Sequence, residues 1–243
     1  MFLPLSDHNP HRHIVAPYVT FALIGINVAV FLLTTGLVPE QTANANALGL
    51  GLIPAVITDR AALAAQLVVV PASATWITHM FMHAGWMHLI GNMLFLWVFA
   101  DNVEDAMGHV RFLVFYILCG LVGGGAHLLF NVASQAPLVG ASGAISGVLA
   151  AYLLLYPRVR VFGLAFNILP VSIPVWLALG TWVALQVFHL LTAQGGATAW
   201  WAHVGGLAAG AALVGVMKHR DVVLFSHERR LPVSVPHFPL RRQ

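Results

Sequence analysis

Charged residues are scarce in this chain of 243 residues, because Asp, Glu, Lys and Arg together make up only 8% of it. A soluble domain carries about 25% charged residues, so this composition excludes an ordinary soluble protein. Hydrophobic residues account for 59% of the chain. The net charge is +3, yet the basic residues cluster at the ends of apolar segments, which is typical of membrane topology rather than of nucleic-acid binding. We therefore expect an integral membrane protein whose surroundings are a lipid bilayer, with no nucleic-acid partner.

Cysteine and metal-binding motifs are also scarce. The single cysteine, Cys119, excludes an internal disulfide, and its apolar surroundings predict a small packing residue. His79, His83 and His88 lie close together, but His-Glu-x-x-His is absent and no cysteine or carboxylate accompanies them. Three histidines without supporting ligands rarely form a metal site, so we expect neither a metal nor another cofactor.

Six apolar segments are long enough, or nearly long enough, to cross the hydrocarbon, which takes about 20 residues. They predict an all-α fold, a bundle of six transmembrane helices over residues 18–217. A tail over residues 1–17 precedes it, and a basic tail over residues 218–243 follows it. The segments are approximately Tyr18–Leu37, His88–Ala100, Val110–Phe130, Gly140–Tyr156, Pro174–Leu191 and Trp201–Met217.

A long connection, about Val38–Thr78, separates the first two segments. Its apolar part, Ala61–Val70, is too short to span and indicates an interfacial or re-entrant segment. Six spans place both termini on one side of the membrane. With the termini in the cytoplasm, ten of the eleven basic residues fall on the cytoplasmic side and only Arg60 falls outside. The positive-inside rule favours this orientation.

This topology brings five polar residues to one depth. The second, fourth and sixth helices all run inward, so each begins just below the outer surface. His83, His88 and Asn92 lie at the start of the second helix, Ser142 at the start of the fourth and His203 at the start of the sixth. Polar residues inside a membrane are costly and usually functional, so this convergence predicts a site.

Ser142 alone is weak evidence, since serine in membrane helices commonly serves in packing. His203 is stronger evidence, because an imidazole in hydrocarbon is costly. Gly206 and Gly210 continue a ridge of small residues that permits close approach to the small-residue stripe of the fourth helix, which includes Gly143. If these stripes pack, the serine and the histidine face each other as a nucleophile and its general base.

No acidic residue occurs between Asp105 and Asp221, so an aspartate that orients His203 is not expected and the site is interpreted as a Ser–His dyad. The orientation of the histidine must then come from packing or from neutral hydrogen bonds. His88 and Asn92 are four residues apart and share a helix face, where they could donate to an oxyanion or simply join helices. His83 is expected to brace the loop before them.

These motifs together resemble the rhomboid family of intramembrane serine proteases. The matching pattern is His83-x4-His88-x3-Asn92, Glu104-x3-Gly108, Gly140-x-Ser142-Gly143 and Ala202-His203-x2-Gly206-x3-Gly210. The resemblance covers about Thr78–Met217. It implies a six-helix bundle that cleaves transmembrane protein substrates near the outer membrane face.

In this resemblance Ser142 is the nucleophile, His203 the base, and His88 and Asn92 the oxyanion contributors. Glu104 and Gly108 would shape the connection after the second helix. Some family members carry, four residues after the nucleophile, an aromatic residue that packs beneath the histidine; this chain carries Ser146 there.

The resemblance also implies a bacterial inner (plasma) membrane protein with both termini cytoplasmic. Two alternatives remain: a catalytically inactive rhomboid-like protein that binds membrane helices, and a small-molecule transporter, which would distribute polar residues along a path through the membrane. The substrate and the oligomeric state do not follow from the sequence.

Overall fold

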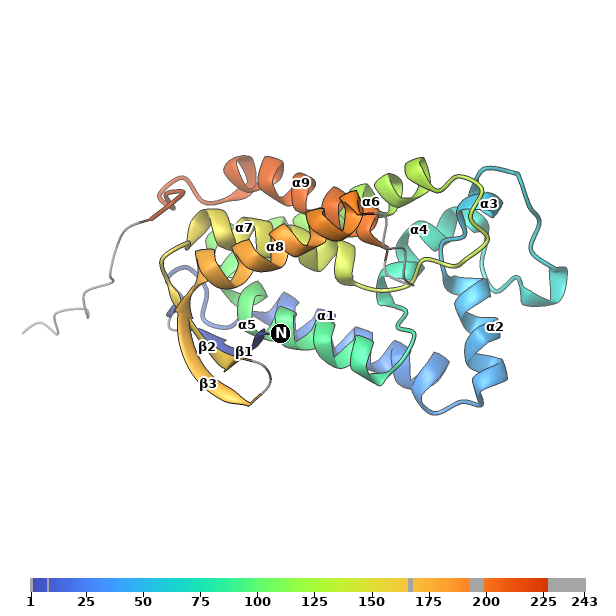
Figure 1. The fold of residues 1–243 in the computed structure, drawn as a ribbon, viewed down its shortest axis with the longest axis horizontal. Coiled ribbons are helices and arrows are strands. Elements are labelled where there is room, and N and C mark those ends of the chain that lie inside the picture. The colour runs from blue at the N-terminus through green and yellow to red at the C-terminus, as the bar shows by residue number, and fades with distance from the viewer. Residues whose placement is uncertain (1, 8, 166–167, 193–198, 227–243) are drawn as a thin grey trace, which may run out of the picture.

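The computed structural model describes residues 2–7, 9–165, 168–192 and 199–226, most of which are helical. Long helices run along the molecule, with a small sheet at one end and the short helices α2–α4 at the other (Figure 1). The helices are α1 (Tyr18–Phe31), α2 (Glu40–Leu50), α3 (Pro54–Ile57), α4 (Thr75–Thr78), α5 (Trp86–Met107), α6 (His109–Phe130), α7 (Ser142–Leu155), α8 (Val175–Leu191) and α9 (Trp200–Met217). The strands are β1 (Phe2–Asp7), β2 (Arg160–Ala165) and β3 (Leu169–Pro174).

Three segments among the described residues are long and apolar enough to cross a membrane: Tyr18–Gly36, His109–Phe130 and Trp200–Met217. The first of them is α1 extended by a π-helical segment. A fourth candidate is Ala65–Phe81 together with α5, which meet at a bend of 74°. α7 and α8 are apolar but have only 14 and 17 residues. Three to four spans therefore follow from length and composition.

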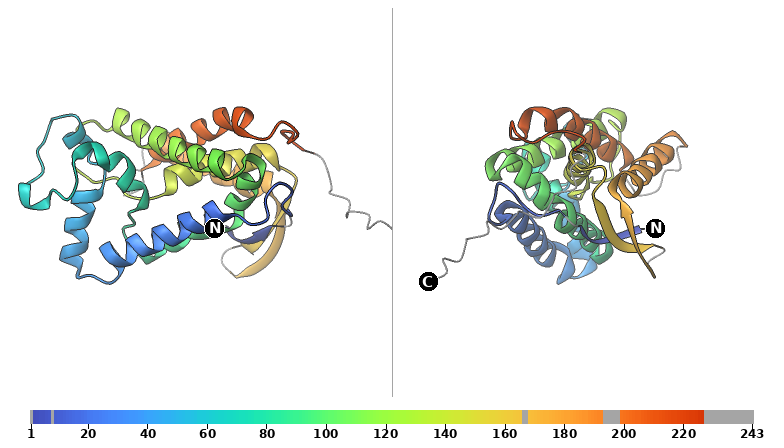
Figure 2. Two further views of the ribbon diagram at one scale, coloured as in Figure 1. Left: turned by 180° about the vertical axis from the view of Figure 1, so that it is seen from behind. Right: turned by 90° about the vertical axis from the view of Figure 1, so that its left-hand side faces the viewer.

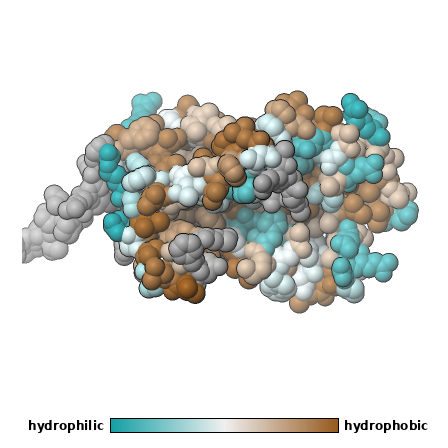
Figure 3. Space-filling model, in the orientation of Figure 1, coloured by the Kyte–Doolittle hydropathy of each residue, from teal (hydrophilic) through white to brown (hydrophobic). Residues whose placement is uncertain are grey.

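The surface of the helices is largely apolar. Hydrophobic side chains cover much of the face drawn in Figure 3, and hydrophilic ones are more frequent toward its right-hand end. The exposed hydrophobic residues occur on several of the long helices and include Leu33, Val110, Leu129, Trp176 and Val216. A water-facing surface would not be favoured with this composition, whereas a lipid-facing surface is.

α7 lies at the centre of the molecule. In the end view of Figure 2 the other long helices surround it. Every residue from Gly143 to Tyr152 is buried. Such a position suits a helix of small residues, because neighbouring backbones can approach it closely on more than one side.

The structure corrects the all-α expectation with a three-stranded antiparallel sheet in the order β1-β2-β3. Phe2 of β1 lies opposite Ala165 of β2, and Arg160 of β2 lies opposite Pro174 of β3. β1 falls within the segment 1–17 that we interpreted as a tail. The basic C-terminal segment 218–243 is described only as far as Ser226, so most of it lies outside the described residues.

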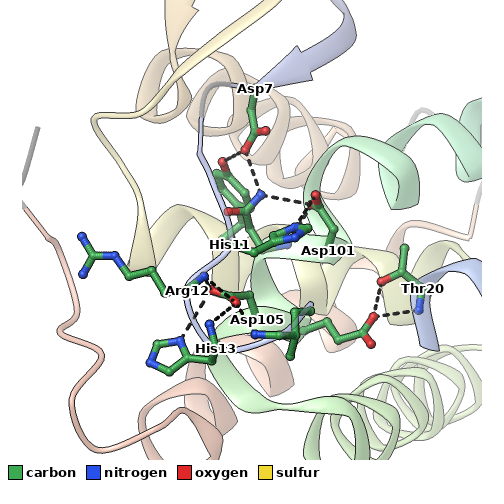
Figure 4. A network of polar contacts seen from close by, with 11 residues as sticks. Asp7, His11, Arg12, His13, Thr20, Asp101 and Asp105 are labelled. Atoms are coloured by element: carbon green, nitrogen blue, oxygen red, sulfur yellow. Dashed lines mark hydrogen bonds and ion pairs between the residues drawn. The ribbon is translucent and has the colours of Figure 1, made fainter. Parts of the chain in front are cut away.

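Carboxylates near the end of α5 hold the segment that leads into α1 (Figure 4). Asp105 accepts from the backbone N–H groups of Arg12, His13 and Ile14 at 2.6–3.0 Å. The ring of His11 contacts the Asp101 carboxylate at 3.0 Å. The chain before α1 is thereby fixed against the bundle.

Glu104 provides the cap that α1 lacks. Pro17, at the N-cap position, makes no side-chain capping bond. The fully buried Glu104 carboxylate instead accepts from the backbone N–H of Val19 at 3.0 Å and from the N–H and hydroxyl of Thr20 at 2.8 and 2.7 Å. A carboxylate at a helix N-terminus satisfies otherwise unpaired donors and interacts favourably with the helix dipole. Gly108, with φ of +80°, joins α5 to α6 in a single residue.

Candidate active site

Ser142 is the first residue of α7, and two positions before it lies a glycine with a backbone conformation that other residues rarely adopt. Gly140 has φ of +132°, and its backbone N–H donates to the carbonyl of His79 at 2.9 Å. A Cβ at this position would lie 2.8 Å from Cε1 and 2.9 Å from Nε2 of His88. Glycine is therefore required both for the backbone conformation and for the close approach of the imidazole.

His203 lies in the first turn of α9 and faces Ser142. Its Nε2 is 2.8 Å from the Ser142 Oγ, a hydrogen bond between side chains that are 61 residues apart in the sequence. A hydroxyl within this distance of an imidazole can transfer its proton as the oxygen attacks an electrophile.

Contact between the backbones of α7 and α9 sets the separation of this pair. A Cβ on Gly206 would lie 1.9 Å from the carbonyl oxygen of Gly143, and one on Gly210 would lie 2.2 Å from that of Gly147. The small-residue stripes identified in the sequence are thus the surfaces that pack. Any side chain larger than hydrogen at these two positions would force the helices apart.

Gln186 of α8 is a partner that the sequence analysis did not identify. Its Oε1 lies 2.8 Å from Nδ1 of His203, so Gln186, His203 and Ser142 form one chain of hydrogen bonds. The signal was available, since a glutamine inside the apolar segment Pro174–Leu191 is unusual in a membrane helix. Of the two means of orienting the histidine that we expected, packing and neutral hydrogen bonds, this contact is one of the second kind.

Aromatic rings of α8 and α9 surround the imidazole. The ring centroids of Trp182 and Trp200 lie 6.2 and 5.9 Å from that of His203. Ser146, which occupies the position of the aromatic residue in some family members, donates instead to the carbonyl of Ser142 at 2.7 Å. The ring is thus held from the side of α8, not from one turn along α7.

His88 and Asn92 lie one turn apart on α5 and line the same cavity as Ser142. The backbone N–H of Ala84 lies 3.4 Å from Nδ1 of His88, which leaves Nε2 on the side of Gly140. The buried Nδ2 of Asn92 has no hydrogen-bond partner among the described residues. Both side chains therefore have nitrogen donors in position for an acceptor that enters the cavity. His83 packs edge-on against the His88 ring with centroids 5.1 Å apart.

The cavity has a volume of about 870 Å³ and is lined by residues of α5, α6, α7, α8 and α9 together with the segment before α7. Such a volume is within the range of ordinary ligand sites, about 300–1,000 Å³. Its polar lining includes Ser142, His203, Gln186, His88 and Asn92. Within the described part of the chain, no group of three or more His, Cys, Asp or Glu side chains is arranged to hold a metal ion.

Comparison with known proteins supports the pattern seen in the sequence. The family model described as the rhomboid domain matches residues 72–220. The chain is 30% identical over 179 residues to the presenilin-associated rhomboid-like protein A, mitochondrial, of Danio rerio, covering 66% of this chain and 44% of that protein.

Two bacterial relatives match shorter regions. The rhomboid protease GluP of Bacillus subtilis is 42% identical over 77 residues, which is 32% of this chain and 15% of that protein. The putative rhomboid protease YdcA of the same organism is 36% identical over 91 residues, covering 34% and 42% of the two chains. The matched regions span less than half the length of each of these three relatives.

Proposed function

The chain belongs to the rhomboid family, and from this we propose that it is an intramembrane serine endopeptidase that cleaves transmembrane proteins near the outer membrane face. One observation carries the proposal: the hydrogen bond of 2.8 Å between the Ser142 hydroxyl and Nε2 of His203 at the border of an open cavity. Ser142 is the nucleophile and His203 the general base, so the enzyme works with a Ser–His dyad.

The reaction follows from the positions of the donors. The Ser142 oxygen attacks the substrate carbonyl while its proton passes to Nε2 of His203. Charge that develops on the carbonyl oxygen is stabilised by Nε2–H of His88, by the Asn92 amide and by the backbone N–H of Ser142 at the start of α7. His203 then protonates the leaving amine. Water hydrolyses the acyl-enzyme, which regenerates the serine.

The membrane arrangement is part of the proposal. We place six spans within residues 18–217, with the segments 1–17 and 218–243 on the cytoplasmic side of a bacterial plasma membrane. α7 has 14 residues and rises about 21 Å, whereas the hydrocarbon is about 30 Å thick. If α7 ends near the cytoplasmic surface, Ser142 lies below the outer one, where water entering the cavity reaches it. The distribution of basic residues supports this orientation, although relatives include mitochondrial as well as bacterial proteins.

Substrates of such a site must expose a peptide carbonyl. An intact transmembrane helix holds its carbonyls in internal hydrogen bonds, so a substrate has to unwind locally before Ser142 can attack it. Small or helix-breaking residues near the cleavage position lower the cost of unwinding. Transmembrane proteins with such residues at the depth of Ser142 are therefore the proposed substrate class.

Labelling with a fluorophosphonate probe tests this function, because the serine oxygen displaces fluoride from phosphorus only when its proton is removed. The wild-type protein in proteoliposomes should be labelled and Ser142→Ala should not. Ser146→Ala is the matched control, since the Ser146 hydroxyl bonds to a carbonyl of its own helix, and it should be labelled like the wild type. An unlabelled wild type that is folded would instead identify an inactive helix-binding member of the family.

A further inference from the structure

α8 is an apolar helix that carries a buried amide. Gln186 is only 6% exposed, and nearly all of its neighbours along α8 are apolar. Burying an amide without hydrogen bonds costs about 1–3 kcal/mol in proteins, so the position of Gln186 depends on what its polar atoms contact. The contact is with His203, at 2.8 Å between Oε1 and Nδ1.

This contact determines where the proton of the imidazole lies. An amide oxygen only accepts hydrogen bonds, so Nδ1 must carry the proton that it accepts. Nε2 is then left with its lone pair directed at the Ser142 hydroxyl, which is the form that a general base requires. In triad enzymes an aspartate has this orienting role. Here no acidic side chain lines the cavity within the described residues.

α8 holds the imidazole at two points. Trp182 and Gln186 are four residues apart and therefore lie on the same face of the helix. The tryptophan ring lies beside the imidazole and the glutamine bonds to it. α7 makes no corresponding contact through Ser146, whose hydroxyl is bonded to the carbonyl of Ser142.

We propose that Gln186 is a positioning residue that keeps His203 in the tautomer able to accept the proton of Ser142. This inference rests on the proposed serine-protease function. It makes α8 the element on which the activity of the base depends. A merely structural role, in which Gln186 joins α8 to α9, predicts loss of stability without a specific change in the reactivity of Ser142.

The test compares two substitutions of nearly equal size. Gln186→Met removes the acceptor, and Gln186→Glu keeps an acceptor but adds a negative charge. The rate of fluorophosphonate labelling of Ser142 is measured from pH 5 to 9 in proteoliposomes, together with the melting temperature of each variant. Leu185→Met, at a half-exposed position on the same helix, is the matched control. The other titratable side chains that line the cavity are His88, His127 and His189, and they are unchanged in all variants.

Gln186→Met should lower the labelling rate on the order of 10–100-fold, part of the 10²–10⁴ that a general base contributes. Gln186→Glu should retain most of the rate at high pH. Its pH midpoint should move upward, because a carboxylate beside the imidazole stabilises the protonated ring. Leu185→Met should match the wild type in rate and midpoint.

Four results would overturn the inference. The first is labelling of Gln186→Met at the wild-type rate, and the second is equal loss in both Gln186 variants in proportion to their melting temperatures. The third applies if Gln186→Met fails to fold, and it is a rate of Gln186→Glu that is reduced at every pH with an unshifted midpoint. The fourth is failure of the wild type to be labelled, which removes the protease function itself and is recognised because Ser142→Ala then behaves identically.

Discussion

The two ends of the bundle use polar residues in opposite ways. Around the end of α5, the buried carboxylates of Glu104 and Asp105 accept from five backbone N–H groups between them. At the other end, Ser142, His203 and Gln186 form a single chain of hydrogen bonds that includes no carboxylate. Asn92 has a buried donor with no partner among the described residues. The two carboxylates are thus fully engaged with the backbone, whereas the Asn92 amide nitrogen beside the cavity has no partner among the described residues.

We interpret the difference as one between polar groups that stabilise the fold and groups that, in the proposed function, contact the substrate. Buried polar groups in native proteins are nearly always hydrogen-bonded, because an unpaired one costs free energy. An unsatisfied donor beside a cavity is therefore an arrangement maintained at the expense of stability. Such donors suit a charge that exists only during the reaction. Changes at the end that holds the carboxylates should alter folding, and changes at the end that holds the cavity should alter rate.

The largest expected effect is on the dyad. Ser142→Ala and His203→Ala should each abolish cleavage of a transmembrane substrate in proteoliposomes, with melting temperatures close to that of the wild type. The double variant should be little worse than either single one, since members of one catalytic unit are not additive. In subtilisin the corresponding losses reach about 10⁶. Cleavage by His203→Ala at more than a trace rate would remove it as the base.

Asn92→Ala and His88→Ala should cause the next largest loss of cleavage activity. Removing one oxyanion donor lowers the turnover of a soluble serine protease about 10²–10³-fold, and the loss here should fall mainly on kcat rather than on KM. The check is to measure the single-turnover cleavage rate and the thermal stability of each variant. If both variants melt far lower yet cleave normally when folded, these side chains join helices, and the two ends of the bundle do not differ as described.

Glu104→Ala should affect stability rather than rate. It leaves the backbone donors of Val19 and Thr20 without their acceptor, and each buried orphan costs about 1–3 kcal/mol. We expect a loss of about 3 kcal/mol in unfolding free energy. Glu40→Ala, at an exposed acidic residue of α2, is the control and should change little. If Glu104→Ala had normal stability but had lost cleavage, Glu104 would serve the reaction rather than the stability of the fold.

The smallest expected effect is on the pH dependence of folding stability. Burial raises the pKa of Asp7 in β1 from 3.8 to about 7 against the lowering effect of its hydrogen bond with Tyr152. The neighbouring charged or titratable groups are Asp101 and His11. Between about pH 4 and 7 Asp7 is therefore protonated to a greater extent in the folded state than in the unfolded chain, and its contribution to stability falls as pH rises.

The Asp7 contribution should accordingly lower the melting temperature by a few degrees from pH 5 to 8, since about 1 kcal/mol corresponds to roughly 2–4 °C at this size. Asp7→Asn should remove this contribution from the pH dependence. Asp59→Asn, at an exposed position with φ of 54° that asparagine tolerates, should leave it unchanged. An equal slope in wild type and Asp7→Asn would show that other groups are responsible.

The sequence was sufficient for the parts of the fold that depend on local patterns. Helix ends near Tyr18, His109 and Leu191 lie within a residue or two of the predicted ones, because apolar length is a local property. The small-residue spacing of Gly206 and Gly210 correctly predicted which faces of α7 and α9 pack. The catalytic roles of Ser142 and His203 remain predictions that the experiments above address.

The features that the sequence did not predict, the small sheet and the contact of Gln186 with His203, depend on residues that are distant in the sequence. Phe2 pairs with Ala165, more than 160 positions away, and two strands of six residues give little signal in a chain dominated by apolar helices. Gln186 was overlooked because a lone amide in an apolar segment has no recognisable partner until the helices are assembled. The absence of an aspartate limited the expected orientation of His203 to packing or neutral hydrogen bonds, and the structure places Gln186 in hydrogen-bond contact with it.

The junction between β3 and α8 has a mechanical consequence. Pro174 ends the strand and Val175 begins the helix, with no loop between them. The backbone N–H groups of Val175 and Trp176 donate to the carbonyls of Val159 and Pro157, which fixes this point to the chain after α7. From here to Gln186 the helix rises about 16 Å, so a change in the tilt of α8 where it meets the sheet displaces Gln186 in proportion to that length. A tilt of about 5° at this point moves the glutamine by about 1.4 Å over that length, enough to break a hydrogen bond to His203.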